Sequence, residues 1–254
     1  MSNLTVKDTS KLTVHTKGTS LGAADNLTSS DVQVPSLILF QKMTDMDGDY
    51  KEGDMIHSIS GDVLGSAKSP LELIVADCYL TQVWYEGKNW IKTMDWDAAM
   101  EADPYESIVD GIKIKKQKCF NYVCFQALDV REIEIPGEAV QYLSSPLIVK
   151  FKGASGKFGK KFNSTLMDYA AFGKPSWVVS FNLTTHSEEN EHGKFMVLEM
   201  AKGKPAIPAQ QLAAENLLKT FRTARVKGEI DVVDSDEKVV SNDVPNHAPG
   251  VGSF

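Results

Sequence analysis

Long runs of strand-forming residues, separated by turns that contain glycine and proline, dominate the chain between residues 34 and 205. Residues 72–84 and 112–128 form the two longest runs and are rich in β-branched and aromatic side chains. A clear hairpin pairs residues 177–185 with residues 195–200 across a polar tip. A chain with many strands and few helices must close or stack its sheets, which predicts a barrel or a sandwich.

Shorter segments complete the predicted order of elements. Further strands are expected at residues 36–41, 55–59, 63–64 and 146–151, and a bulge is expected within residues 112–128. Residues 95–110 are acidic and compatible with a helix, and a short helical piece is expected between residues 133 and 146. Residues 152–162 are predicted to form a basic loop broken by glycines.

One helix is strongly indicated near the end of the chain. Pro208 is a favourable first residue, and an apolar stripe runs to Arg225 through Leu212, Leu217, Leu218 and Phe221. The predicted fold class is therefore β-dominant (α+β). We expect an OB-like barrel or sandwich elaborated with hairpins, with one prominent C-terminal helix at residues 208–225.

The chain is predicted to hold one domain between two flexible ends. Its 254 residues suffice for one large β domain. Residues 1–33 carry few large apolar groups and are expected to form a flexible arm. Residues 34–227 form the predicted β-rich domain, and residues 228–254 are expected to be a flexible acidic tail.

Composition points to a protein of the cytoplasm. No apolar run approaches the roughly 20 residues that span a bilayer, and the N-terminus lacks a signal segment. Cys78, Cys119 and Cys124 include no Cys-x-x-Cys pair and are expected to be buried, reduced thiols. We therefore expect no membrane partner and a location in the cytoplasm, that of the host cell if the protein is viral.

Charge is distributed unevenly along the chain. The formal net charge of −7 divides into −9 for residues 1–109, +6 for residues 110–230 and −4 for residues 231–254. A basic middle between acidic segments permits binding to a polyanion, although an unevenly charged, solvated surface would show the same pattern.

Two partial motifs fail on spacing. Asp45, Asp47 and Asp49 alternate as in a calcium loop, but Tyr50 and Ile56 occupy the positions that need glycine and glutamate. Residues 153–157 resemble a phosphate-binding loop, but Phe158 occupies the position five residues after Gly153 that needs a second glycine. The first segment is predicted to be an acidic turn, and the second keeps only its flexible, cationic character.

No catalytic or metal centre is predicted. His186 and His192 bracket three glutamates at a hairpin tip, where a solvated turn is favoured over a zinc site. No serine, cysteine or threonine lies in a recognisable nucleophile elbow. We therefore expect no enzyme activity and no cofactor.

Lysines interleaved with aromatic residues form the pattern that most strongly indicates a binding site. Residues 150–162 hold five lysines, three phenylalanines and no acid, and the lysines of residues 113–118 precede two more aromatics. Cations that follow phosphates and rings that stack on bases suit single-stranded nucleic acid. The alternative is that the rings belong to the core and the lysines point to solvent. The predicted nucleic-acid-binding residues are Lys115, Lys116, Lys118, Phe120, Tyr122, Lys150, Lys152, Lys157, Phe158, Lys160, Lys161 and Phe162.

The C-terminal tail resembles the tails of bacterial and phage single-stranded DNA-binding proteins. It is acidic and ends in the aromatic Phe254, although no acid lies beyond Asp243. The resemblance implies that Phe254 docks a replication partner, such as a phage polymerase, primase or helicase.

A second resemblance covers residues 34–200. Residues 35–41 (Pro-Ser-Leu-Ile-Leu-Phe-Gln), Gly53-Asp54, residues 60–65 and the hairpin of residues 181–185 with 193–195 are similar to a family of tailed-phage proteins. The resemblance implies a single-stranded DNA-binding protein of phage replication or recombination. Three alternatives stay open: a phage structural or decoration protein, an inhibitor that captures a host protein through the acidic half, and, last, an enzyme.

Overall fold

The computed structural model describes residues 33–42, 44, 46, 48–86, 89–95, 106–109, 111–134, 139–191, 193–226 and 231–232. Most of the expected N-terminal arm and C-terminal tail, with Phe254, therefore lies outside the described residues. Two residues of the expected tail are paired, however, because β14 (Asp231–Val232) runs parallel to β1 (Gln33–Val34).

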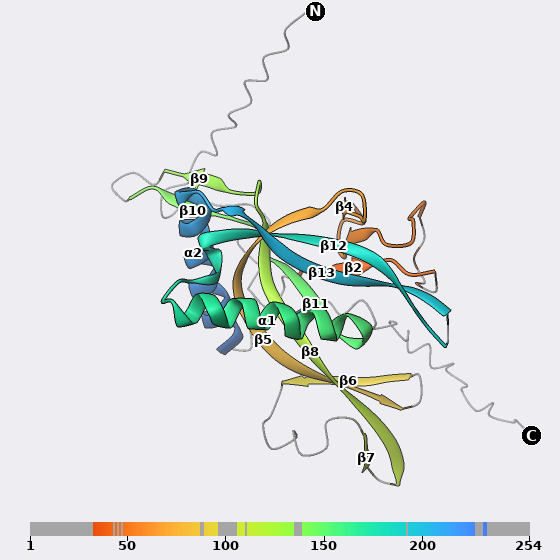
Figure 1. The fold of residues 1–254 in the computed structure, drawn as a ribbon. Helices are drawn as coiled ribbons and strands as arrows, with labels where there is room; N and C mark the ends of the chain where they lie inside the picture. The colour runs from red at the N-terminus through yellow and green to blue at the C-terminus, as the bar shows by residue number, and fades with distance from the viewer. Residues whose placement is uncertain are drawn as a thin grey trace, which may run out of the picture.

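A seven-stranded antiparallel sheet forms the centre of the molecule (Figure 1). Five strands follow the order β11-β8-β5-β12-β13, and two further strands extend the ends of the central pair, β6 beside β5 and β7 beside β8. The bounds are β5 (Leu71–Glu86), β6 (Asn89–Asp95), β7 (Glu106–Val109), β8 (Ile112–Gln126), β11 (Leu147–Phe151), β12 (Val179–Asn190) and β13 (Gly193–Pro205). The long runs and the hairpin expected from sequence are confirmed as β5, β8 and β12–β13.

The expected bulge lies in the strand opposite the one predicted. Val75 pairs with Cys124 and Asp77 pairs with Val123, so Ala76 is the extra residue and belongs to β5 rather than β8. Because a bulge adds one residue, it keeps the apolar faces of both strands aligned with the layers that cover them.

Three smaller sheets surround the central one. Strands β2 (Leu37–Leu39), β3 (Met55–His57) and β4 (Val63–Gly65) form an antiparallel meander, which confirms the three short strands expected there. The meander docks on the β12–β13 hairpin through the Gln41 amide, which exchanges two hydrogen bonds with the backbone of Met196 at 2.7 and 2.9 Å. Strands β9 (Arg131–Ile133) and β10 (Gln141–Leu143) form a separate hairpin, and β1–β14 is the third sheet.

Two helices cover opposite faces of the central sheet. Helix α1 (Gly156–Ala171) follows the short 3-10 helix η4 (Gly153–Ser155), and α2 (Pro208–Val226) comes after the 3-10 helix η5 (Ser176–Val178) and the β12–β13 hairpin. The face with Leu73, Phe120 and Phe181 packs against α1 and the meander. The opposite face, with Ile74, Val123 and Phe125, packs against α2. Each face thus buries its own apolar core.

The β-dominant class is confirmed, and the described strands form open sheets rather than a closed barrel. Helix α2 is confirmed, but its buried stripe consists of Ala213, Ala214, Leu217 and Phe221, whereas Leu212 is 45% exposed. The helix expected within residues 95–110 is wrong for Glu106–Val109, which form β7, and residues 96–105 lie outside the described part. Between residues 133 and 146 the described residues form strand β10 instead of a helical piece.

The largest correction concerns residues 152–162, predicted as a loop and found as η4 and the first turns of α1. Gly159 explains the error, because it lies inside the helix and allows close packing rather than breaking the chain. A Cβ added there would lie 2.8 Å from Cβ of Phe151 and 2.9 Å from Cδ2 of Phe120. The apolar spacing of Phe158, Phe162 and Leu166 follows the helical period of the inner face.

Helix α1 ends at a glycine in the left-handed region. Gly173 has φ of 65° and donates to the carbonyl of Ala170 at 2.9 Å, while Lys174 donates to the carbonyl of Tyr169 at 2.9 Å. These bonds satisfy carbonyls at the end of the helix in the usual manner of a glycine cap. The cap leaves Phe172 at the exposed end of α1.

Candidate nucleic-acid interface

Three of the predicted stacking aromatics are buried in the core. Phe120, Tyr122 and Phe162 are 6%, 0% and 2% exposed. Tyr122 packs edge-on against Phe162 with ring centroids 5.1 Å apart, and its hydroxyl donates to Oδ1 of Asn163 at 2.7 Å. Burial raises the pKa of the Tyr122 hydroxyl, which therefore stays a protonated donor. The alternative left open by the sequence, that these rings belong to the core, is correct for all three.

Phe158 is half-buried at the N-terminal end of α1. Its ring meets His186 edge-on at a centroid distance of 5.0 Å, and Nζ of Lys157 lies 5.0 Å from its centroid. Of the four predicted rings, Phe158 is the one that is not buried.

The lysines of β8 are divided between the two faces of the sheet. Lys115 is exposed and lies opposite Tyr85, whereas Lys116 lies opposite Trp84 and places Nζ 4.9 Å from the indole centroid. Lys118 pairs with Gln82, a fully buried residue whose two side-chain polar atoms make no hydrogen bond to the described part of the chain. Because alternate residues point to opposite faces, Lys116 and Lys118 share one side and Lys115 lies on the other.

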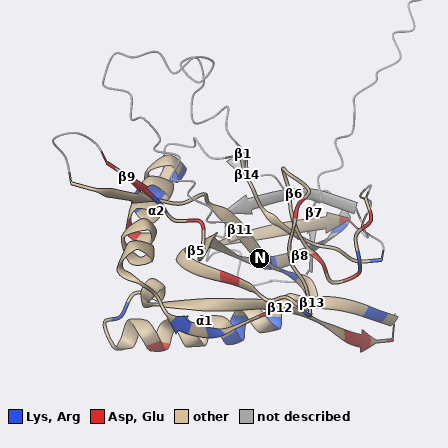
Figure 2. Ribbon diagram, turned by 90° about the horizontal axis from the view of Figure 1, so that it is seen from above, with Lys and Arg blue, Asp and Glu red and all other residues tan. Residues whose placement is uncertain are grey.

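The remaining lysines fall into two further groups. Lys150 lies on β11 opposite Asn121 of β8, and Lys152 directly follows β11. Both lysines are half-buried. Lys157, Lys160 and Lys161 are exposed on α1, where a spacing of three and four residues places them side by side. The structure therefore brings together three of the eight predicted lysines on one helix face (Figure 2).

Lys157 occupies a position that helix stability does not favour. The first turn of α1 has no acidic residue, and its N-terminus carries the positive end of the helix dipole. A lysine near that end costs a few tenths of a kcal/mol, up to about 1 kcal/mol. The positive potential of the dipole and the ammonium groups adds up at this end of α1, which suits a polyanion.

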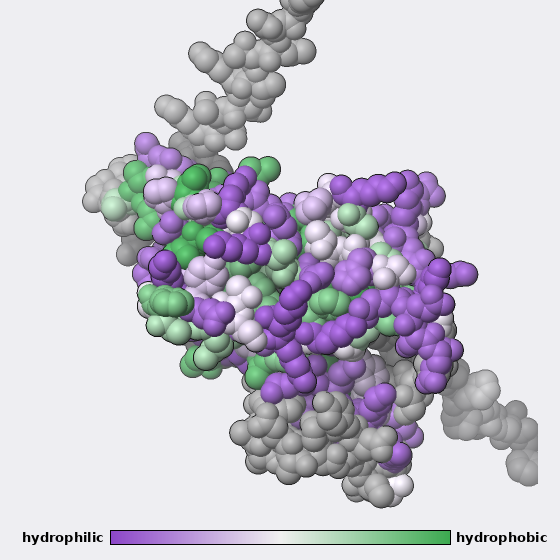
Figure 3. All heavy atoms as spheres, viewed as in Figure 1, coloured by the Kyte–Doolittle hydropathy of each residue, from purple (hydrophilic) through white to green (hydrophobic). Residues whose placement is uncertain are grey.

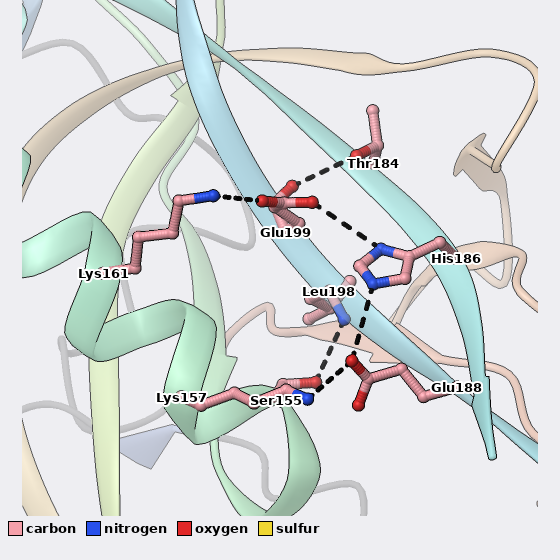
Figure 4. Close-up of polar contacts among 8 residues, drawn as sticks. All are labelled: Ser155, Lys157, Lys161, Thr184, His186, Glu188, Leu198 and Glu199. Carbon is pink, nitrogen blue, oxygen red and sulfur yellow. Dashed lines mark hydrogen bonds and ion pairs between the residues drawn. The ribbon is translucent and has the colours of Figure 1, made fainter.

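Two of these lysines contact carboxylates of the β12–β13 hairpin (Figure 4). Nζ of Lys157 lies 2.6 Å from Oε1 of Glu188, and Nζ of Lys161 lies 2.8 Å from Oε1 of Glu199. His186 lies between the carboxylates, with Nε2 3.9 Å from Glu188 and Nδ1 3.8 Å from Glu199. Within the described part of the chain, Lys160 makes no ion pair.

Sequence reasoning missed the aromatic residues at the far end of α1. Phe172 is 79% exposed, and Tyr169 is half-buried with Nζ of Lys202 5.8 Å from its ring centroid. Lys174 is exposed two residues beyond Phe172. The signal was an aromatic residue directly before Gly173, but it becomes readable only when residues 156–171 are recognised as a helix.

A separate hollow of about 450 Å³ lies beside the bulge in β5, between Asp77, Cys78, Arg222, Arg225 and Val226. Arg222 holds Asp77 in a two-pronged ion pair with both distances 2.8 Å, and hydrogen bonding to Asp77 raises the arginine pKa. Burial raises the pKa of Cys78 to about 12, so this thiol is protonated at neutral pH and is a poor nucleophile. Cys119 and Cys124 are buried free thiols, as predicted.

Metal-binding geometry is absent from the part of the chain that the structure describes, where no three His, Cys, Asp and Glu side chains are grouped to hold an ion. Asp45, Asp47 and His192, which belong to the two weighed motifs, lie outside the described residues. The helices among the described residues are too short or too polar to cross a membrane.

Comparison with known proteins identifies no relative. No protein-family model, no curated protein and no solved structure matches the chain. The candidate interface therefore stands on its own residues.

Proposed function

We propose that the protein binds single-stranded DNA, without marked sequence preference, along the outer face of α1. The observation that carries the proposal is the exposed row of Lys157, Lys160 and Lys161 at the positive end of a helix without an acid in its first turn. Ammonium groups in such a row suit successive phosphates of a flexible strand.

An exposed aromatic residue at the other end of α1 supplies the second chemistry. The helix spans about 24 Å at roughly 1.5 Å per residue, and Phe172 follows its last residue. We assign base stacking to Phe172 rather than to Phe120, Tyr122 and Phe162, whereas Tyr169 is half-buried and packs against the core. Lys174 and Lys202 lie close to this end of the helix and extend the cationic surface. The arrangement favours unpaired bases, because a duplex hides its base faces.

The proposal does not depend on an OB-like barrel. In OB-fold proteins the strands supply the binding face, whereas here the cationic row lies on a helix that packs across an open sheet. We retain a role in phage DNA replication or recombination as part of the proposal, with Phe254 of the tail docking a polymerase, primase or helicase.

One observation favours a second candidate, a structural or inhibitory protein that binds another protein. Apolar side chains are exposed around the β9–β10 hairpin and the start of α2: Leu128, Val140, Leu143, Ile207 and Leu212. Figure 3 shows hydrophobic surface gathered at this end of the molecule. Exposed apolar patches commonly mark protein-binding surfaces.

A titration of the full chain separates the two candidates. Fluorescence anisotropy at low salt, with a labelled mixed-sequence oligonucleotide about 30 bases long, should show binding to the single strand and weaker binding to its duplex. Equal affinity for both forms, or no binding, would refute the first candidate. The protein-binding candidate predicts no affinity for either nucleic acid.

A further inference from the structure

Two of the three lysines that the proposed function assigns to DNA form ion pairs with carboxylates. Glu188 on β12 and Glu199 on β13 reach across from the hairpin to Lys157 and Lys161, as Figure 4 shows. The hairpin is held against the start of α1 by a buried contact, in which the Leu198 amide donates to Oγ of Ser155 at 3.0 Å. The carboxylates are therefore fixed relative to the lysines by the fold.

We propose that Glu188 and Glu199 form an acidic latch, which imitates phosphate and inhibits DNA binding until a strand displaces it. This inference rests on the proposed function of α1. Carboxylate and phosphate oxygens accept hydrogen bonds from the same ammonium groups, so a strand must replace the latch at Lys157 and Lys161. The lysine side chains are 61% and 74% exposed, which leaves them accessible to an incoming phosphate.

His186 lies between the two carboxylates of the latch. Its two ring nitrogens face Glu188 and Glu199 at 3.9 and 3.8 Å, and Phe158 covers its ring. The charged groups around it are Lys157 and Lys161 from α1, Glu188 from β12 and Glu199 from β13.

The latch is tested by removing its charges without changing its shape. The variant Glu188→Gln with Glu199→Gln should bind a 30-base single strand about two- to tenfold more tightly at pH 7.5, because each exposed ion pair is weak and its loss frees one lysine. The control is Glu189→Gln with Glu215→Gln, which removes the same charge from exposed positions, one on the same strand and one on α2. Thermal melting checks that all variants are folded.

The comparison of the latch variant with its control separates the latch from the proposed function. Equal affinities of latch and control variants would overturn the latch while leaving the proposed function intact. Failure of wild type and latch variant alike to bind any single strand would overturn the proposed function and the latch together.

Discussion

Replacement of Lys157, Lys160 and Lys161 by alanine should flatten the salt dependence of DNA binding. Each phosphate contact of a single strand contributes about 0.7 to the slope of log affinity against log salt. Three lost contacts should therefore reduce the magnitude of the slope by about 2. Over a fourfold increase in salt, that difference amounts to about 20-fold in affinity, which a titration resolves easily.

The same substitutions should leave the fold almost unchanged. The ion pairs of Lys157 and Lys161 are exposed, and such pairs stabilise a protein by at most about 1 kcal/mol each. Alanine favours the helix, and loss of positive charge near its N-terminus relieves an unfavourable interaction with the dipole. We expect the free energy of unfolding to change by less than about 1 kcal/mol, as measured by urea denaturation.

Anisotropy titrations at four salt concentrations between 50 and 200 mM provide the slopes. The matched control replaces Lys42, Lys51 and Lys68, which are exposed in and around the β2–β4 meander, and removes the same net charge. The control should keep the wild-type slope to within about 0.5, less than one phosphate contact. If the α1 variant and the control change the slope equally, the lysines act only through net charge and the proposed interface is wrong.

Three further predictions follow from single residues. Phe172→Ala should weaken binding to single-stranded DNA by about 1–3 kcal/mol with little loss of stability, because the ring is 79% exposed and is assigned to stacking; unchanged affinity would remove it from the site. Gly159→Ala should destabilise the protein by about 1–3 kcal/mol through overpacking against Phe151. Gly156→Ala has open space around its added Cβ and should stabilise the protein by up to about 1 kcal/mol, as measured by the same urea denaturation. Gln82→Leu should raise the free energy of unfolding by about 1–3 kcal/mol, because it removes a buried amide that makes no hydrogen bond to the described residues; a loss of stability would show that the amide has a partner.

The strands and α2 could be predicted because their patterns are long and regular. Residues 72–84 and 112–128 contain no glycine or proline, and uninterrupted segments of this length form either a strand or a helix. Their β-branched residues favour the strand. Helix α1 was missed because Gly153, Gly156 and Gly159 are spaced like loop residues. One of them, Gly159, is required by packing against a sheet that the local sequence does not reveal.

The candidate site was predicted only in part, for a similar reason. The alternation of side chains along a strand puts Lys116, Lys118 and Phe120 on one face, but it does not show that α1 covers that face at Phe120. The lysines of residues 150–161 lie on a strand, after a strand and on a helix, so no single period describes their directions. Their ion pairs with Glu188 and Glu199 join residues about 30 to 40 positions apart, which sequence spacing does not show.

The pairing of β1 with β14 brings the first and last described strands of the domain side by side. Gln33 lies beside Asp231, at the distance of about 4.8 Å that separates neighbouring strands. Because the two strands are parallel, the chain enters the domain at one end of this pair and leaves it at the other. Residues 33 and 232 could therefore be joined by a short linker and new ends opened in a surface turn, giving a circular permutant that keeps every strand partner of the original chain.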